Sequence, residues 1–403
     1  MWKVLKRIAL VMVVLVIAGL GFVWWYDSTG QRPDPGFEPR VERPAYPSAP
    51  GGRHPRVVID DAHRNFHTAD GRYRPFAELL RSDGYTVSSN RRMFGAEMLK
   101  DVDVLVIANA MGPGEHEGRP AFTPEEDAAV VGWVRTGGAL FLIADHAPFG
   151  SAAARLAAGF GVTMHLRFAR DDDFHDGWDN ERLEFSRSNR LLADNAITNG
   201  RSVSERVNRV VTFTGQSLSG PPGALALLRL SEGAYDWESR EVRYPAAGHV
   251  QALALSAGSG RVVVSGEAAL FTAQVDPLGR KFGMNRTDTD DRQLLLNILQ
   301  LAVMLAEAAA TGRKLRLGIG DKHWRDQRSA EHGEHQRCEN ASHAIDSTRF
   351  FPVCVGKRSR VSPMLADPAR STPIRVYLFR FHITLISLHA EEPSCTTHES
   401  CRS

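Results

Sequence analysis

Cysteine is missing from most of this 403-residue chain. All four cysteines lie after residue 337, at Cys338, Cys354, Cys395 and Cys401. Residues 1–337 therefore offer no thiol nucleophile, no disulfide and no thiolate ligand for a metal ion.

A strong charge of either sign is also lacking. The formal net charge is +2, and charged residues make up 24% of the chain. Without a broad basic field, the chain is not expected to bind nucleic acid through its phosphates. The apolar share of 43% is ordinary for a globular protein, and the length leaves room for two or three domains.

The N-terminus has one long stretch without charge. Residues 8–25 read IALVMVVLVIAGLGFVWW, and Lys3, Lys6 and Arg7 precede them. The run has about the minimum length that crosses the hydrocarbon core of a bilayer. Its aromatic end, at residues 24–26, would lie in the interfacial belt of the membrane.

A cleaved signal peptide is the alternative, but bulky residues fill the place where an A-x-A-like cleavage site would be needed. No cysteine lies nearby for a lipid anchor. We therefore expect residues 1–30 to be an uncleaved signal anchor that crosses the cell membrane once. The basic end predicts a cytoplasmic N-terminus, with the rest of the chain extracytoplasmic, on the periplasmic side.

Residues 31–55 contain seven prolines. This composition favours extended polyproline II backbone that has no core of its own. It predicts a semi-rigid linker that lifts the next domain off the membrane.

Residues 56–310 alternate strand-like and helix-like patterns. Apolar β-branched runs predict strands, and the helix within 122–138 begins at a capping box formed by Thr123 and Glu126. The predicted strands are 56–60, 85–88, 103–110, 139–144 and 260–267, and the predicted helices lie within 72–84, 122–138, 150–161 and 290–310. Repeated β-α-β units favour an α/β fold with a doubly wound, mainly parallel, flavodoxin-like sheet. The less regular residues 162–260 have apolar stretches at 209–213, 224–230 and 249–255, which predict extra strands.

The sequence changes character in residues 311–403. This tail holds all four cysteines and seven of the fifteen histidines, with little periodicity. Its CTTHESC and CENASH segments do not have the spacing of paired zinc ligands. We expect a disordered or aberrant extension rather than a metal site, and the sequence leaves the cofactor of the chain unknown.

Polar side chains follow four predicted strands at the points where these strands end. In an open α/β sheet, ligands bind outside the carboxyl ends of the strands. The candidate catalytic or binding residues at this edge are Asp61, His63, Asp145, His146 and Glu267, and the candidate ligand-binding residues are Asn65, His67 and Asn109. Asp60 ends the first strand. Turn caps, loop positions and helix N-termini are the structural alternatives for each of these side chains.

Three segments, DDAHRNFHTADGRYRPF, LFLIADHAPFG and GEAALFTAQ, carry a resemblance to a known family. Over residues 55–305 the chain resembles the class I glutamine amidotransferase-like superfamily, and within it uncharacterised bacterial proteins near the trehalose-utilisation-protein-like branch. The resemblance implies a nucleophilic cysteine after the strand at 139–144, and a histidine and a glutamate after a late strand. Here the turn offers Asp145 and His146, and the late strand offers Glu267 without an adjacent histidine. Because no cysteine precedes residue 338, glutaminase activity is not expected.

Two classes of function remain open. In the first, the strand edge binds or hydrolyses a small polar or carbohydrate-like ligand, with Phe66, Phe149 or Trp178 stacking on a sugar ring. If the domain is hydrolytic, His63, His146 and either Asp61 or Glu267 are a possible ligand set for a divalent ion. In the second, the domain is a non-catalytic interaction or scaffold module of the cell envelope, with an unknown protein partner.

The segment RDDDFHDGWDNE, at residues 170–181, is a further acidic cluster. It is a candidate cation-binding loop, although most runs of this kind are solvated surface.

Overall fold

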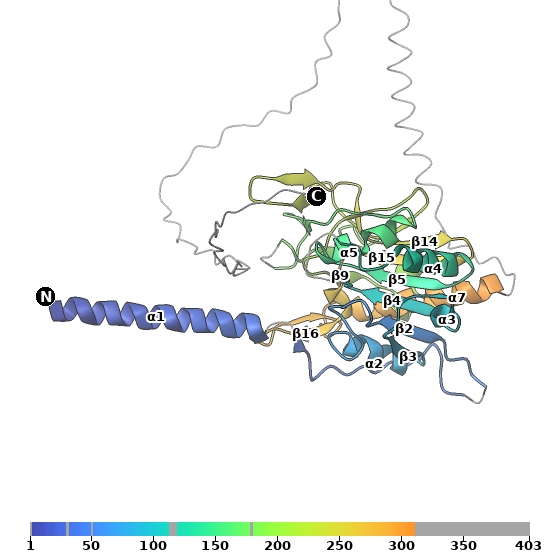
Figure 1. Ribbon diagram of the computed structural model, residues 1–403, viewed down its shortest axis with the longest axis horizontal. Helices are drawn as coiled ribbons and strands as arrows, with labels where there is room; N and C mark the ends of the chain where they lie inside the picture. The colour runs from blue at the N-terminus through green and yellow to red at the C-terminus, as the bar shows by residue number, and fades with distance from the viewer. Residues whose placement is uncertain (1, 30–31, 50, 113–118, 178–179, 311–403) are drawn as a thin grey trace, which may run out of the picture. The chain divides into compact units, whose positions relative to one another are not determined.

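The computed structural model describes residues 2–29, 32–49, 51–112, 119–177 and 180–310 (Figure 1). The predicted tail with its cysteines, and Trp178, lie outside the described residues. Within the described parts, the body is built around one nine-stranded sheet with the order β3-β2-β4-β5-β15-β14-β10-β6, and β11 pairs with β14. The strands are β2 (Arg56–Asp60), β3 (Thr86–Asn90), β4 (Val104–Ala108), β5 (Ala139–Ile143), β6 (Thr163–Met164), β10 (Leu218–Ser219), β11 (Leu225–Arg229), β14 (Val250–Ala257) and β15 (Gly260–Ser265).

The sheet is mixed rather than mainly parallel. Strands β3, β2, β4, β5 and β15 are parallel, whereas β14, β10, β6 and β11 join them through antiparallel pairs. In chain order the parallel part reads 2-1-3-4-5, which is the flavodoxin-like order. The prediction of an α/β fold is therefore confirmed, and the antiparallel part comes from the segment whose sequence pattern was irregular.

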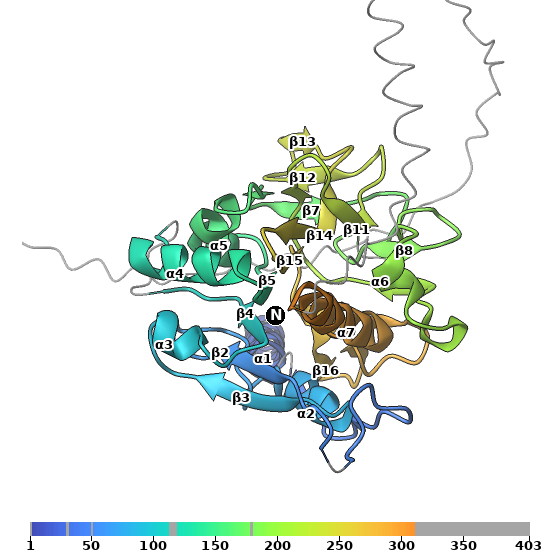
Figure 2. The ribbon, with the colours of Figure 1, turned by 90° about the vertical axis from the view of Figure 1, so that its right-hand side faces the viewer.

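Helices cover both faces of the sheet (Figure 2). On one face lie α2 (Arg74–Ser82) and α7 (Asp291–Ala310), and on the other lie α3 (Ala96–Leu99), α4 (Pro124–Arg135) and α5 (Phe149–Ala158). All residues of β4 and β5 are buried between these layers, which explains their uninterrupted apolar sequence. The expected capping box is present at α4, where Thr123 and Glu126 exchange side-chain to backbone hydrogen bonds.

Smaller elements flank the large sheet. One three-stranded sheet contains β7 (Phe168–Arg170), β12 (Tyr235–Trp237) and β13 (Arg243–Pro245), and another contains β1 (Arg32–Pro33), β16 (Ala273–Val275) and β17 (Lys281–Gly283). A pair is formed by β8 (Glu184–Ser186) and β9 (Arg209–Val211), and the short helical segments are α6 (Ala196–Asn199), η1 (Val203–Glu205) and η2 (Ala269–Phe271). The extra strands expected at 209–213, 224–230 and 249–255 correspond to β9, β11 and β14.

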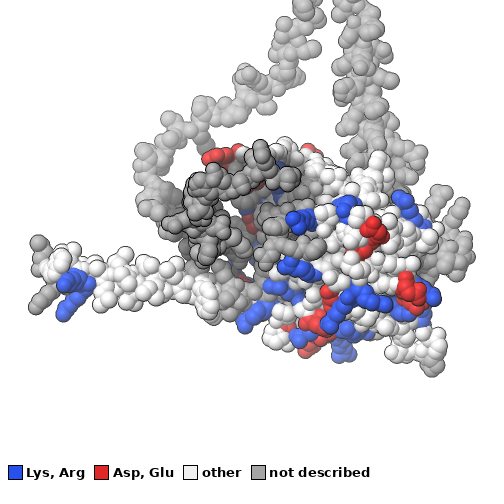
Figure 3. Space-filling view, viewed as in Figure 1, with Lys and Arg blue, Asp and Glu red and all other residues white. Residues whose placement is uncertain are grey.

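The N-terminal segment forms the single helix α1 (Trp2–Thr29). Within it, Val4–Phe22 is long and apolar enough to cross a bilayer, and a signal sequence would have the same properties. Figure 3 shows α1 without charge over most of its length, with basic side chains gathered near its N-terminal end.

The Pro-rich segment differs from the spacer that its composition predicted. Asp83, at the end of α2, accepts hydrogen bonds from Ala45 N (2.6 Å, to Oδ1) and Tyr46 N (3.0 Å, to its carbonyl). Phe37, Val41 and Tyr46 pack against the core. These apolar side chains stand between the prolines, and the stiff backbone loses less entropy when it docks. Much of the segment is therefore attached to the domain.

Candidate functional site

The turn after β5 joins two neighbouring strands through side chains. Asn109, directly after β4, has a φ of +47°, a left-handed conformation that asparagine tolerates better than most residues. Its Nδ2 donates to Asp145 Oδ2 (2.6 Å), and Asp145 N donates to Asn109 Oδ1 (2.9 Å). The two candidates are thus brought together at the carboxyl edge of the sheet.

Asp145 also reaches the loop after β15. Its Oδ1 accepts a hydrogen bond from Ala268 N (2.7 Å). Burial raises the pKa of Asp145 to about 7, although the hydrogen bonds from Asn109 and Ala268 act in the opposite direction. Near neutral pH the carboxyl group is therefore partly protonated, and it can accept a hydrogen bond when ionised or donate one when protonated. The residue as a whole is half-buried, and both oxygens of its carboxyl group already accept a hydrogen bond.

Glu267 is buried next to Asp145. Its two carboxylate oxygens accept hydrogen bonds from Ala269 N (2.6 Å) and Leu270 N (2.9 Å), at the start of η2. Burial, together with the charge of Asp145, raises the pKa of Glu267. These hydrogen bonds match the structural alternative given in the sequence analysis, in which Glu267 is an acid at the N-terminus of a helix.

Tyr73 lies beside this carboxyl pair. It is fully buried, and its hydroxyl donates to Ala268 O (3.1 Å). Burial and the charges of Asp145 and Glu267 raise its pKa. The sequence did not predict that Tyr73 belongs to this site. Its position inside a predicted amphipathic helix indicated only a side chain of the hydrophobic core.

His63 is enclosed by two carboxylates. Its Nδ1 lies 2.8 Å from Asp60 Oδ2, and its Nε2 lies 2.8 Å from Glu126 Oε1. All three side chains are buried. Burial alone would lower the pKa of His63, but the two carboxylates raise it. Both nitrogens can donate to the carboxylates at once only when the imidazole is protonated, so this geometry favours the cation.

This arrangement leaves His63 no nitrogen for a metal ion. Phe94 and Phe122 pack on the ring at centroid distances of 4.6 and 4.9 Å, so the group is closed in by apolar side chains as well. Glu126, predicted only as part of a capping box, also binds a histidine 63 positions away. No local sequence signal could show that contact.

Asp61 and Asn65 bond to the backbone around the first strand end. Asp61 Oδ1 accepts from Ala69 N (3.2 Å), and burial raises its pKa. Asn65 Oδ1 accepts from His63 N (3.1 Å), and its Nδ2 donates to Ala108 O (3.3 Å). Both side chains shape the loop, while Asp61 keeps partial exposure.

His67 lies among aromatic and basic groups. It is buried, and its Nδ1 has no hydrogen-bond partner among the described residues. Burial and the nearby Arg72 lower its pKa to about 3, so the ring is neutral. Arg72 stacks over the ring of Phe66 at 3.9 Å, and Phe66 is 5.5 Å from the ring of Phe149. Phe66 keeps 37% of its surface exposed.

His146 contacts the next residue and an aromatic ring. Its Nδ1 lies 2.6 Å from Ala147 O, and its ring packs against that of Phe168 at a centroid distance of 3.9 Å and an angle of 32°. Burial lowers its pKa. Gln216, which no sequence pattern singled out, donates to the carbonyl groups of Ala144 (2.8 Å) and Asp145 (2.9 Å) and holds this turn.

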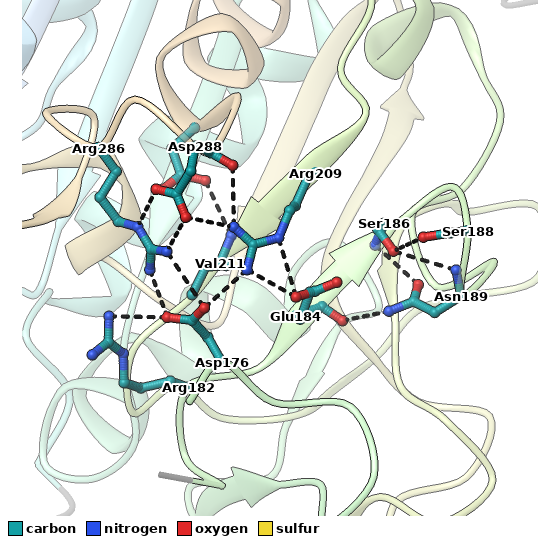
Figure 4. A network of polar contacts seen from close by, with 11 residues as sticks. Asp176, Arg182, Glu184, Ser186, Ser188, Asn189, Arg209, Val211, Arg286 and Asp288 are labelled. Atoms are coloured by element: carbon teal, nitrogen blue, oxygen red, sulfur yellow. Dashed lines mark hydrogen bonds and ion pairs between the residues drawn. The ribbon is translucent and has the colours of Figure 1, made fainter. Parts of the chain in front are cut away.

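Two aspartates of the acidic segment 170–181 pair with arginines. Asp176 lies between Arg182 (3.3 Å), Arg209 (2.9 Å) and Arg286 (2.7 Å), as Figure 4 shows. Hydrogen bonds and charges from these arginines keep the pKa of Asp176 low although burial would raise it. Asp172 is bound to Arg243 (3.1 Å). These pairs give no support to a cation-binding loop.

Comparison with known proteins leaves the family of the chain open. No protein-family model and no curated protein sequence matches it. Similar solved structures include the N-terminal domain of mmIFT52, with 13% identity, a TM-score of 0.44 and coverage of 62% of this chain and 97% of that chain.

Two further structures have comparable scores. A ThuA-like protein from Bacteroides uniformis has 14% identity and a TM-score of 0.35, and covers 66% of this chain and 94% of its own. A GMP synthase-like protein from Thermoplasma acidophilum has 10% identity and a TM-score of 0.36, and covers 64% of this chain and 97% of its own. With TM-scores below 0.5, these likenesses do not define an activity.

Proposed function

We propose that the chain is a membrane-anchored protein whose amidotransferase-like α/β domain binds a small polar or carbohydrate-like ligand at the carboxyl edge of the sheet. The domain lies on the extracytoplasmic side of the cell membrane and has no glutaminase activity. The observation that carries the proposal is Asp145, a half-buried residue at the end of β5 whose carboxyl group has a pKa raised to about 7.

The surroundings of Asp145 suit a polar ligand with a ring. A carboxyl group that titrates near neutral pH accepts from or donates to hydroxyl groups. On the neighbouring loop, the partly exposed side chain of Phe66 offers aromatic surface, and Arg72, which lies over the Phe66 ring, adds hydrogen-bond donors. Phe66 N donates to Asn109 O (2.9 Å), so the aromatic group is tied to the residue that binds Asp145.

Binding is better supported than hydrolysis. A metal-assisted or acid–base mechanism needs free imidazole or carboxylate groups that face a substrate. Both nitrogens of His63 contact carboxylates, and both oxygens of Glu267 accept backbone hydrogen bonds. Because these side chains already bond within the protein, the structure also favours the alternative function, a non-catalytic interaction module of the envelope.

The ligand proposal is tested by thermal unfolding of the full chain in detergent. The probes are glucose, maltose, N-acetylglucosamine and glycerol, because a ligand that binds only the native state raises the melting temperature. We expect at least one sugar to raise it, and the shift to be lost in Phe66→Ala. The matched control is Phe174→Ala, since Phe174 is similarly exposed at 36%. No shift with any probe, or an equal shift in Phe66→Ala, would support the interaction module instead.

The proposed topology is tested by cysteine labelling in a variant without the four native cysteines. Val203→Cys places a thiol at a site in the body that is 89% exposed, and Trp2→Cys places one before the apolar span Val4–Phe22. In intact bacterial cells with a permeabilised outer membrane, an impermeant maleimide should label residue 203 but not residue 2. The reverse pattern would contradict an extracytoplasmic domain.

A further inference from the structure

Two histidines and an aspartate meet beside the edge of the large sheet, away from Asp145. His165 follows β6, Asp236 lies on β12, and His249 precedes β14. One candidate ligand atom from each residue lies within 4.8 Å of those of the other two. Two imidazoles and one carboxylate form a donor set that is typical of Zn²⁺.

One oxygen of the aspartate lacks a partner. Asp236 is 3% exposed, and its Oδ1 is buried without a hydrogen bond among the described residues. Its Oδ2 accepts from Ser217 Oγ (2.8 Å). Leaving a carboxylate oxygen buried and unpartnered is costly, so a cation is the missing partner that this position fits.

Two serines orient the histidines. Ser219 Oγ lies 2.8 Å from His165 Nε2, and Ser217 Oγ lies 3.3 Å from His249 Nδ1. Hydroxyl groups on one imidazole nitrogen leave the other nitrogen available to an ion, as in the outer shell of many zinc sites. Both histidines are partly exposed, which gives an ion a path from solvent.

Two features of the site oppose ion binding: the orientation of the histidine rings and a nearby positive charge. The imidazole rings stack at 4.2 Å with an angle of 11° between their planes. Because a ring nitrogen binds an ion in its own ring plane, one ring must tilt. The positive charge of Arg167 also lies nearby, but Glu238 pairs with it at 3.2 Å.

We propose that His165, Asp236 and His249 bind one Zn²⁺ ion, with a fourth position left to water. The ion fastens β12, and with it the sheet of β7, β12 and β13, to β6 and β14 of the large sheet. The residues come from segments up to 84 positions apart, which only the folded chain brings together, so binding of the ion stabilises the fold. The proposal is independent of the ligand site at Asp145.

The test uses the full chain in detergent, purified without a polyhistidine tag, stripped with a chelator and with its cysteines blocked by N-ethylmaleimide. Titration with Zn²⁺ alone should show about one ion more per chain than the double variant His165→Ala/His249→Ala binds. Zinc bound by other histidines is the same in the wild type and in the double variant, so it does not contribute to the difference between them. The matched control, His54→Ala/His175→Ala, should bind as much as the wild type.

Two gentler variants keep the test valid if the double variant does not fold. Asp236→Asn should weaken Zn²⁺ binding at least about tenfold, and Ser217→Ala about tenfold, as for outer-shell partners of other metal sites. With Co²⁺ in place of Zn²⁺, the visible absorption bands of a tetrahedral site should be present in the wild type and absent in Asp236→Asn. Equal Zn²⁺ content and affinity in the wild type, the double variant and Asp236→Asn would overturn the proposal.

Discussion

Asn109 and Asp145 bind each other through two hydrogen bonds across the ends of β4 and β5, at 2.6 and 2.9 Å. The backbone of Asn109 adopts a left-handed conformation at this point. The amide of Asn109 supplies one donor and one acceptor, which no carboxylate can do when ionised. The pair therefore fixes the turn that the proposed ligand site uses.

Replacing Asn109 by aspartate should destabilise the protein in a pH-dependent way. The variant sets a second carboxyl group against Asp145, and two adjacent carboxylates repel when both ionise. We expect Asn109→Asp to lower the free energy of unfolding by about 2 kcal/mol or more at pH 8 and by less at pH 5. Urea unfolding at the two pH values measures this. Asn180→Asp, which faces Asp172 at an exposed site, is the control and should change little.

The raised pKa of Asp145 predicts a second pH effect. Its folded-state pKa of about 7 exceeds the ordinary aspartate value of 3.8, so its contribution to stability is full below about pH 4 and is lost as the pH rises through 7. Asp145→Asn has no such titration. The stability difference between the wild type and Asp145→Asn should therefore shift by roughly 2 to 4 kcal/mol between pH 4.5 and pH 8.

The control for this titration is Asp172→Asn. The hydrogen bond from Asn180 lowers the pKa of Asp172 despite partial burial, so its contribution is lost only when the pH falls below the usual aspartate range. Between pH 4.5 and pH 8 its difference from the wild type should stay nearly constant. A flat profile for Asp145→Asn as well would show that Asp145 titrates normally.

His63 should be an imidazolium at neutral pH. Its pKa is raised by Asp60 and Glu126, so the stability it provides is full below pH 6.5 and is lost as the pH rises through its folded-state pKa. Nitrogen NMR of the ring should show both nitrogens protonated at pH 7. His63→Ala leaves two buried carboxylates without their cation and should cost about 3–5 kcal/mol. His54→Ala, at an exposed histidine, should cost little.

Gly84 tests the docking of the Pro-rich segment. Its φ is +94°, and a Cβ added there would lie 1.7 Å from Tyr46 O. Gly223 has a similar φ of +88° but open space around the same position. Gly84→Ala should therefore cost at least about 1 kcal/mol more than Gly223→Ala. Trypsin should also cleave at Arg40 and Arg43 faster in Gly84→Ala, and equal rates in the two variants would show that the segment is not held.

The central strands β4 and β5 could be predicted because burial on both faces leaves a direct mark on the sequence. The apolar run at 139–144 becomes β5, and the run at 103–110 becomes β4. The small sheet could not be predicted. Its β7 and β12 are three residues each and pair across more than 60 positions, and such short segments have too few residues for a period to emerge.

For the candidate site, the sequence predicted which residues lie at the same edge of the sheet, but not which hydrogen bonds their side chains make. The carboxyl ends of parallel strands meet at one edge of the sheet, and the sequence pattern therefore placed Asn109, Asp145 and Glu267 at the same edge. Whether a carboxylate there faces a ligand or a backbone amide depends on loop conformation, and the sequence does not show that Glu267 bonds to η2. For the same reason, the contact of Glu126 with His63 was missed.

The pairing of β1 with β16 limits how far the domain can move from its anchor. Helix α1 ends at Thr29 and β1 begins at Arg32, a gap that spans at most about 11 Å of extended chain. Under the proposed anchoring, the domain explores only a thin layer above the lipid surface. Encounters with other proteins of the same membrane then take place in two dimensions, at an effective concentration set by the area they share.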